Sequence, residues 1–238
     1  MKKAGVIIFA AALVIGLVVS NIFSFGHFAD RFLHFSIDFS GEKGSGRITS
    51  ETRDLKGFKA IDVGGVFEVE IMAQQDFKVE VETDDNLLPL IKTEVDGSVL
   101  RIESEERISP TGKILVRISA PDINELDISG AAKLTLNNVK NSSLAVDSSG
   151  ASRVTVVGET TKFAVETSGA SKVYAQELRS VDATIDGSGA SNVFVTVSGE
   201  LNADLSGASK VVYSGTPTAV HKKVSGAGRV SQKHSDDE

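Results

Sequence analysis

Charged residues recur at fixed distances from a repeated Ser-Gly corner in the second half of the chain. Repeated carboxylates can collect Ca²⁺ or bind a charged polymer, and two suitably spaced carboxylates can hydrolyse a glycosidic bond. Three residues before the glycine lies the acidic column: Asp127, Asp147, Glu166, Asp186 and Asp204. Three residues after the glycine lies the basic column, which Asn192 interrupts: Lys133, Arg153, Lys172, Lys210 and Arg229.

The acidic column also has a simpler interpretation, as a solvated face that keeps the protein soluble and discourages sideways aggregation. Stacked like charges repel at strand spacing, so each column requires solvent, counterions or pairing with the other column. The spacing differs from that of the nonapeptide repeats of calcium-binding solenoids. We therefore expect no metal site, and we keep a carbohydrate-binding or carbohydrate-active acidic column as the alternative.

Other catalytic groups are scarce in this sequence. The absence of cysteine excludes thiolate nucleophiles, disulfides and cysteine zinc sites, and two tyrosines without tryptophan leave few platforms for sugar rings. None of the 4 histidines is placed to activate a corner serine. We expect the serines to satisfy the backbone of the turn instead. They precede the glycine at Ser129, Ser149, Ser168, Ser188, Ser206 and Ser225, and follow it at Ser152, Ser171, Ser191 and Ser209. The sequence thus predicts no catalytic residue and no cofactor.

The elements that position these columns follow from the repeat itself. The structural corner glycines are Gly130, Gly150, Gly169, Gly189, Gly207 and Gly226, about 19 residues apart, and an alanine follows each of them. Apolar residues four positions before and after the glycine indicate two strands per unit with inward side chains. Such a unit cannot bury its apolar face alone, so the units must stack with parallel strands in register. This predicts an all-β fold, a parallel β-solenoid of six coils, with the alanines where adjacent coils crowd. Parallel crossovers are nearly always right-handed.

The remaining segments divide the chain into four parts. Residues 1–26, two lysines followed by an apolar run, fit either a cleaved export signal or a retained membrane anchor helix. Residues 27–53 read as a neck, with Phe28, Phe32, Phe35 and Phe39 on one helical face and a flexible joint at "GEKGSGR". The solenoid is expected over residues 54–232, and residues 233–238 form a charged tail. Within the solenoid, Asp96-Gly97 predicts a two-residue hairpin.

Several stretches give the chain a family resemblance. "IDVGGVFEVEI", "DDNLLPLIKTEVDGSVLRI" and "LDISGAAKLTL" with its echoes resemble the bacterial head GIN domain family of putative auto-transporter adhesins, from about Gly44 to Val230. The resemblance implies a right-handed parallel β-helix in exported envelope proteins, with no assigned enzyme activity and no agreed binding residues. It also aligns Asp62 with Asp127 and Gly65 with Gly130, so that the solenoid begins near Phe58.

These observations predict a non-enzymatic β-solenoid outside the cytoplasm of a bacterium, in the periplasm or at the cell surface. The net charge of −7 without a basic stretch argues against a nucleic-acid partner. The expected ligand is an envelope or surface protein or polysaccharide whose identity the sequence does not give. The membrane is a further partner if the N-terminal helix is retained, and the open strand edges of a solenoid favour homo-oligomers.

Overall fold

The computed structural model describes residues 41–233, and each structural statement below concerns this part of the chain. The expected signal or anchor helix, the four phenylalanines of the neck and residues 234–238 lie outside it. The described chain is all-β, with a 16-stranded and a two-stranded sheet and a single 3-10 turn, η1 (Leu88–Leu90). None of its helical segments has the length and apolar character needed to cross a membrane.

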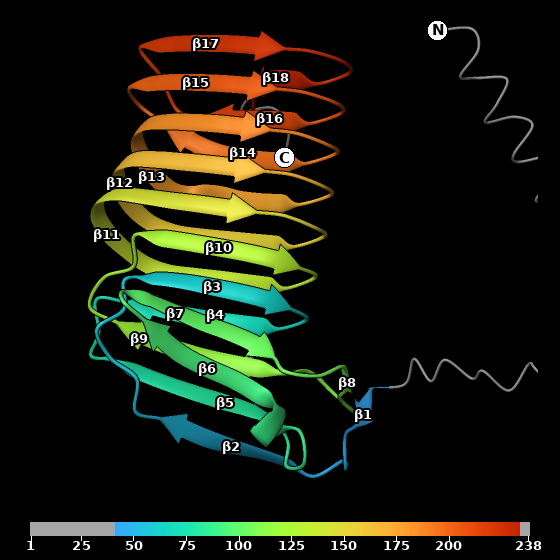
Figure 1. Cartoon of the computed structure of the whole chain (residues 1–238). Coiled ribbons are helices and arrows are strands. Elements are labelled where there is room, and N and C mark those ends of the chain that lie inside the picture. The colour runs from blue at the N-terminus through green and yellow to red at the C-terminus, as the bar shows by residue number, and fades with distance from the viewer. Residues whose placement is uncertain (1–40, 234–238) are drawn as a thin grey trace, which may run out of the picture. The chain divides into compact units, whose positions relative to one another are not determined.

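The predicted β-solenoid is confirmed, with about five turns in place of the six coils expected (Figure 1). Each corner glycine separates two faces of the solenoid, the pre-corner sheet and the post-corner sheet. The pre-corner sheet contains β3 (Ala60–Gly65), β10 (Glu125–Gly130), the second halves of β11 (Lys133–Ser148), β12 (Arg153–Thr167) and β13 (Lys172–Gly187), β15 (Glu200–Leu205) and β17 (Ala219–Val224). The post-corner sheet contains β4 (Glu68–Ala73), the first halves of β11, β12 and β13, β14 (Asn192–Val197), β16 (Lys210–Ser214) and β18 (Arg229–Gln232).

The coils pair in parallel with the register that the repeat predicts. Asp127 of β10 lies opposite Asp62 of β3 on one side and Asp147 of β11 on the other. The segment around β3 and β4 is therefore a diverged first coil, as its alignment with Gly130 predicted. Register shifts occur only in the long strands β11, β12 and β13, between their two halves. The handedness of the coils stays a prediction.

The apolar columns of the repeat form the core. The residues four positions before the glycine are buried, as predicted: Leu126, Val146, Val165, Ile185 and Ala203. Those four positions after it are buried as well: Leu134, Val154, Val173, Val193 and Val211. The two sheets therefore enclose a continuous interior, in which every coil contributes side chains from both of its strands.

The small residues at the corner are arranged differently from the prediction. The alanines that follow the glycines are exposed rather than packed inside, as Ala151 and Ala170 show. The serines two positions after the glycine are the inward residues, because strand alternation carries them to the core side. Their hydroxyls bond to the turn, as expected: Ser171 Oγ donates to Ser168 O at 3.1 Å, and Ser191 Oγ donates to Ser188 O at 3.0 Å.

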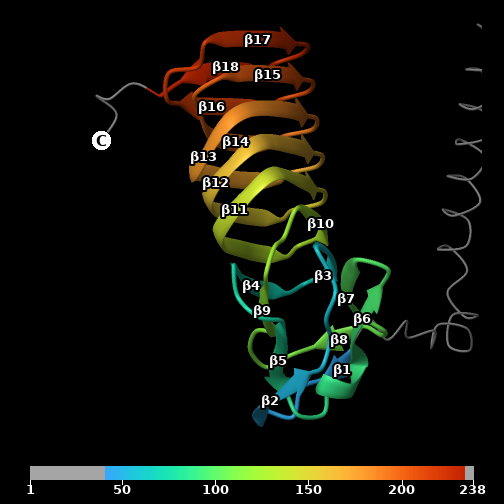
Figure 2. The same cartoon turned by 90° about the vertical axis from the view of Figure 1, so that its left-hand side faces the viewer.

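Strands that depart from the repeat complete the N-terminal end (Figure 2). β9 (Leu115–Ala120) pairs in parallel with β4, β5 (Lys78–Asp84) runs antiparallel to β9, and β2 (Ile48–Arg53) runs antiparallel to β5. β7 (Val99–Ser104) pairs in parallel with β3 and antiparallel with β6 (Ile91–Asp96). The predicted hairpin is present, but its two turn residues are Gly97, at φ +60°, and Ser98 rather than Asp96 and Gly97, because Asp96 pairs with Val99 as the last residue of β6.

The prediction of a flexible joint at residues 41–47 is wrong, because hydrogen bonds hold this segment in the described structure. β1 (Glu42–Lys43) pairs in parallel with β8 (Ile108–Ser109), and the Gly46 N–H donates to Asp84 Oδ1 at 2.7 Å. The same buried carboxylate accepts bonds from the backbone N–H and the hydroxyl of Thr111 at 3.0 and 2.6 Å. These hydrogen bonds lower the pKa of Asp84, and the bond from the Thr111 hydroxyl has the largest effect. The segment is held because one carboxylate binds both it and the loop after β8.

The last coil carries a charge where earlier coils carry core residues. Lys222 of β17 lies opposite Ala203 of β15, in the inward column, and it is exposed because no coil among residues 41–233 covers it. An inward-pointing charge discourages edge-to-edge association. We expect Lys222→Val to make the protein self-associate with increasing concentration, and sedimentation velocity will measure this. His221→Val, which changes an outward residue of the same strand, is the control. A monomeric Lys222→Val protein would contradict the protective role.

Candidate functional site: two charged columns and the face beside them

The acidic column is continuous along the pre-corner sheet. Its five predicted residues lie opposite one another in successive strands, and Asp62 of β3 precedes them in the same row. A cation closes the row at each end. Arg101 Nε donates to Asp62 Oδ2 at 3.1 Å, and Lys223 Nζ donates to Asp204 Oδ2 at 2.7 Å. Lys223, which interrupts the acidic pattern in the sequence, therefore pairs with Asp204, the last carboxylate of the row.

The carboxylates between the two ends face solvent without a cationic partner. Among residues 41–233, no ion pair includes Asp127, Asp147, Glu166 or Asp186. Partial burial, and then the neighbouring charges of Asp62 and Asp147, raise the pKa of Asp127. Solvent and mobile counterions thus screen this row, since the basic column does not pair with it.

The arrangement is a charged row rather than a metal cage. A shallow hollow of about 350 Å³ runs along Asp147, Glu166, Asp186 and Asp204. Within residues 41–233, no group of three or more acidic, histidine or cysteine side chains has the arrangement of a metal site. The two-carboxylate chemistry of glycosidases requires an acid and a base in different environments. Here a carboxylate recurs at the same position of successive coils from Asp62 to Asp204, each in a similar exposed row.

Neutralising the middle of the acidic column tests the repulsion. We expect Asp147→Asn, Glu166→Gln and Asp186→Asn together to leave the free energy of unfolding unchanged or to raise it at low salt, because like charges at strand spacing repel. The effect is expected to shrink at high salt, where exposed charges are screened. Urea denaturation at both salt concentrations, with and without calcium, measures it. A clear loss of stability, or calcium stabilisation of the unmodified protein alone, would contradict this interpretation.

The basic column runs along the post-corner sheet, on the other side of the corner. Its residues are exposed and in register, with Asn192 between Lys172 and Lys210. Lys133 Nζ donates to Glu68 Oε1 of the first coil at 2.9 Å. The remaining four cations make no ion pair within the described chain. The structure thus brings each predicted column together and keeps the two columns apart.

A partly apolar column lies beside the basic one and was missed in the sequence. Two residues further along each strand, in register, come Thr135, Thr155, Tyr174, Phe194 and Val212. The rings of Tyr174 and Phe194 are stacked, with centroids 5.2 Å apart and an interplanar angle of 0°. Both rings are partly buried on the outer surface. The signal was present in the repeat, five positions after the corner glycine.

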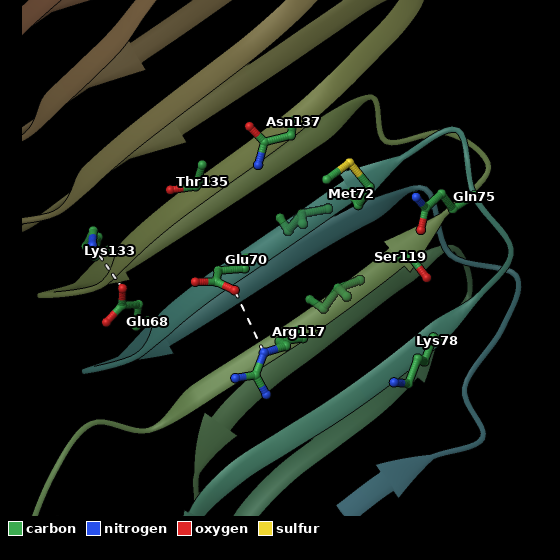
Figure 3. A pocket seen from close by; sticks show the side chains of 12 residues that line it. Glu68, Glu70, Met72, Gln75, Lys78, Arg117, Ser119, Lys133, Thr135 and Asn137 are labelled. Atoms are coloured by element: carbon green, nitrogen blue, oxygen red, sulfur yellow. Dashed lines mark hydrogen bonds and ion pairs between the residues drawn. The ribbon is translucent and has the colours of Figure 1, made fainter. Parts of the chain in front are cut away.

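The same face ends in a pocket at the first coils (Figure 3). The pocket has a volume of about 360 Å³ and lies over β4, β9 and β11. Lys133, Thr135 and Asn137 of β11 line one side, Glu68 and Glu70 lie on the middle strand β4, and Arg117 and Ser119 of β9 line the other side (Figure 3). Hydrogen bonds from Lys133 and then Lys113 lower the pKa of Glu68, so this carboxylate stays ionised and paired with the two lysines.

Known proteins share this sequence pattern and fold. Residues 57–217 match the family model described as "Putative auto-transporter adhesin, head GIN domain". No curated protein matches the sequence. The fold is similar to the crystal structure of a putative adhesin from Bacteroides fragilis, with 18% identity, a TM-score of 0.69, and coverage of 80% of this chain and 99% of that chain. A putative adhesin from Parabacteroides distasonis has 20% identity, a TM-score of 0.47, and coverage of 81% and 99%. A putative lipid binding protein from the same species has 17% identity, a TM-score of 0.47, and the same coverage.

Proposed function

Because the chain belongs to the head GIN domain family of putative auto-transporter adhesins, we propose that it is an adhesin-like binding domain of the bacterial envelope, exported from the cytoplasm. The single observation that carries this proposal is the pair of long, flat, charged faces built from in-register columns. Such faces suit a long or repetitive partner better than a small substrate. A non-enzymatic role follows, since a repeated surface places no distinct acid, base and nucleophile together.

Location and attachment test this function together. In the bacterium that carries the chain, we expect an antibody to find it in envelope or periplasmic fractions. A strain lacking the chain is expected to attach less to surfaces that the parent strain colonises, and full-length protein supplied from a plasmid restores attachment. A chain confined to the cytoplasm, or attachment unchanged by the deletion, would overturn the proposal.

A further inference from the structure

We propose that the post-corner face of β12, β13, β14, β16 and β18 binds an acidic polysaccharide, with the basic column holding its acidic groups and the Tyr174 and Phe194 rings packing against a sugar. The proposal rests on the proposed function and names its ligand. The face is exposed and flat, and one edge of it carries a row of positive charge. Its neighbouring column supplies the chain's stacked aromatic pair.

The unpaired cations are the first part of the argument. Arg153 and Lys172 lie in neighbouring coils, as do Lys210 and Arg229, so one pair of cations lies on each side of Asn192. Neighbouring strands are about 4.8 Å apart, a spacing close to the length of one sugar unit in an extended chain. In the described structure these cations have no carboxylate partner, while Lys133 is already paired with Glu68. A polymer with regularly placed acidic groups would supply the missing anions.

The aromatic pair is the second, independent part. Tyr174 and Phe194 lie two residues beyond Lys172 and Asn192, on the same outer face. Thr155 is the next residue in the column beside Tyr174, and Val212 is the next one beside Phe194. Each ring therefore stacks against the other ring on one face only. Aromatic rings pack against the apolar faces of sugars, and a surface of charged side chains alone does not provide that contact. The Tyr174 hydroxyl makes no hydrogen bond within residues 41–233 and is available to a ligand.

The surfaces on either side of this face determine which coils an acidic polymer can contact. The three cations that line the pocket beside the first coils, Lys78, Arg117 and Lys133, are already held in ion pairs and offer no free charge to an acidic chain. The acidic column lies beyond the corner glycines on the other sheet. An acidic polymer is therefore directed along the solenoid axis, over the coils from Arg153 to Arg229.

Matched substitutions test the face with full-length protein. Arg153→Asn, Lys172→Asn and Lys210→Asn together place in three coils the residue that the basic column already carries at position 192. Tyr174→Thr and Phe194→Thr likewise place in two coils the residue that the neighbouring column carries at 135 and 155. Asp147→Asn, Glu166→Gln and Asp186→Asn form the control on the acidic column. Calorimetry measures binding to polygalacturonate, heparin, neutral dextran and inorganic polyphosphate.

We expect the unmodified protein to bind polygalacturonate, which carries carboxylates alone, or heparin, which carries sulfates in addition to carboxylates, and not dextran. The triple asparagine variant should lose about tenfold in affinity, and the threonine variant about fivefold for the acidic glycans but not for polyphosphate. The acidic-column control should bind at least as tightly as the unmodified protein. Absence of binding to both acidic glycans would overturn the proposal, as would full affinity in the triple asparagine variant. Equal losses of the threonine variant on polyphosphate would overturn the sugar assignment.

The two proposals fail in different ways. If the deletion strain attaches poorly while the purified chain binds neither acidic glycan, the envelope function stands and the ligand assignment is wrong. If the chain binds acidic glycans through this face but attachment is unchanged by deletion, the binding site stands and the adhesive role is wrong.

Discussion

Replacing Gly169 with asparagine is expected to lower the free energy of unfolding by about 2–4 kcal/mol, because a side chain there strikes the coil beneath. Gly169 has φ +77°, and a Cβ at this position would lie 2.5 Å from Gly150 O and 3.1 Å from Gly150 N. The crowding occurs where the two coils bond, since the Ala170 N–H donates to Gly150 O at 2.7 Å. The coils must separate to accommodate the side chain, which lengthens bonds of the ladder.

Gly97 provides the matched control, since it separates crowding from backbone conformation. It also has a positive φ, of +60°, but a Cβ there would meet nothing within 4 Å. Asparagine tolerates this conformation, so Gly97→Asn should change the free energy of unfolding by less than about 1 kcal/mol. Urea denaturation of both variants measures the difference. Similar losses at the two positions would show that conformation, and not stacking of the coils, requires the corner glycine.

The repeat made the columns predictable because parallel, in-register stacking converts a distance along the sequence into a row in space. Asp147 and Glu166 share an offset from their glycines, and they lie side by side in the sheet. The same alternation could have placed the corner residues correctly. Residues four positions from the glycine point inward, so those two positions away, such as Ser152, also do, and the adjacent alanines do not. The error came from treating small size as a sign of burial.

The parts that escaped prediction lie where the repeat ends. Arg101 binds the first carboxylate of the acidic column from β7, a strand that pairs with β3 but lies outside the repeat. No offset from a corner glycine therefore identifies it. The antiparallel pairing of β2 with β5 joins segments without a shared pattern, so its register depends on tertiary packing. The Tyr174 and Phe194 pair lies in a column that carries Thr155 in the preceding coil, so the shared offset predicts a row of outward residues but not a stacked aromatic pair.

A second large effect is expected in the core, where size alternates between adjacent coils. Phe163 of β12 lies opposite Ala183 of β13, and both are 2% exposed. Phe163→Ala should lower the free energy of unfolding by about 3–5 kcal/mol, because the removed ring leaves a cavity between stacked coils. Ala183→Phe should lower it by about 1–3 kcal/mol, because the added ring overpacks a filled position.

The double variant Phe163→Ala with Ala183→Phe distinguishes local packing from the total apolar volume. If the two coils share one space, the second ring fills the cavity left by the first, and the double variant should be more stable than Phe163→Ala alone. Ala164→Ser, an outward position on the same strand, should change the free energy of unfolding by less than about 0.5 kcal/mol. Chemical denaturation of the unmodified protein, the two single variants and the double variant completes the cycle, and Ala164→Ser is measured beside them. Strictly additive losses would mean that each coil packs its own core residues independently, and that the stacked columns owe their order to backbone pairing rather than to interlocking side chains.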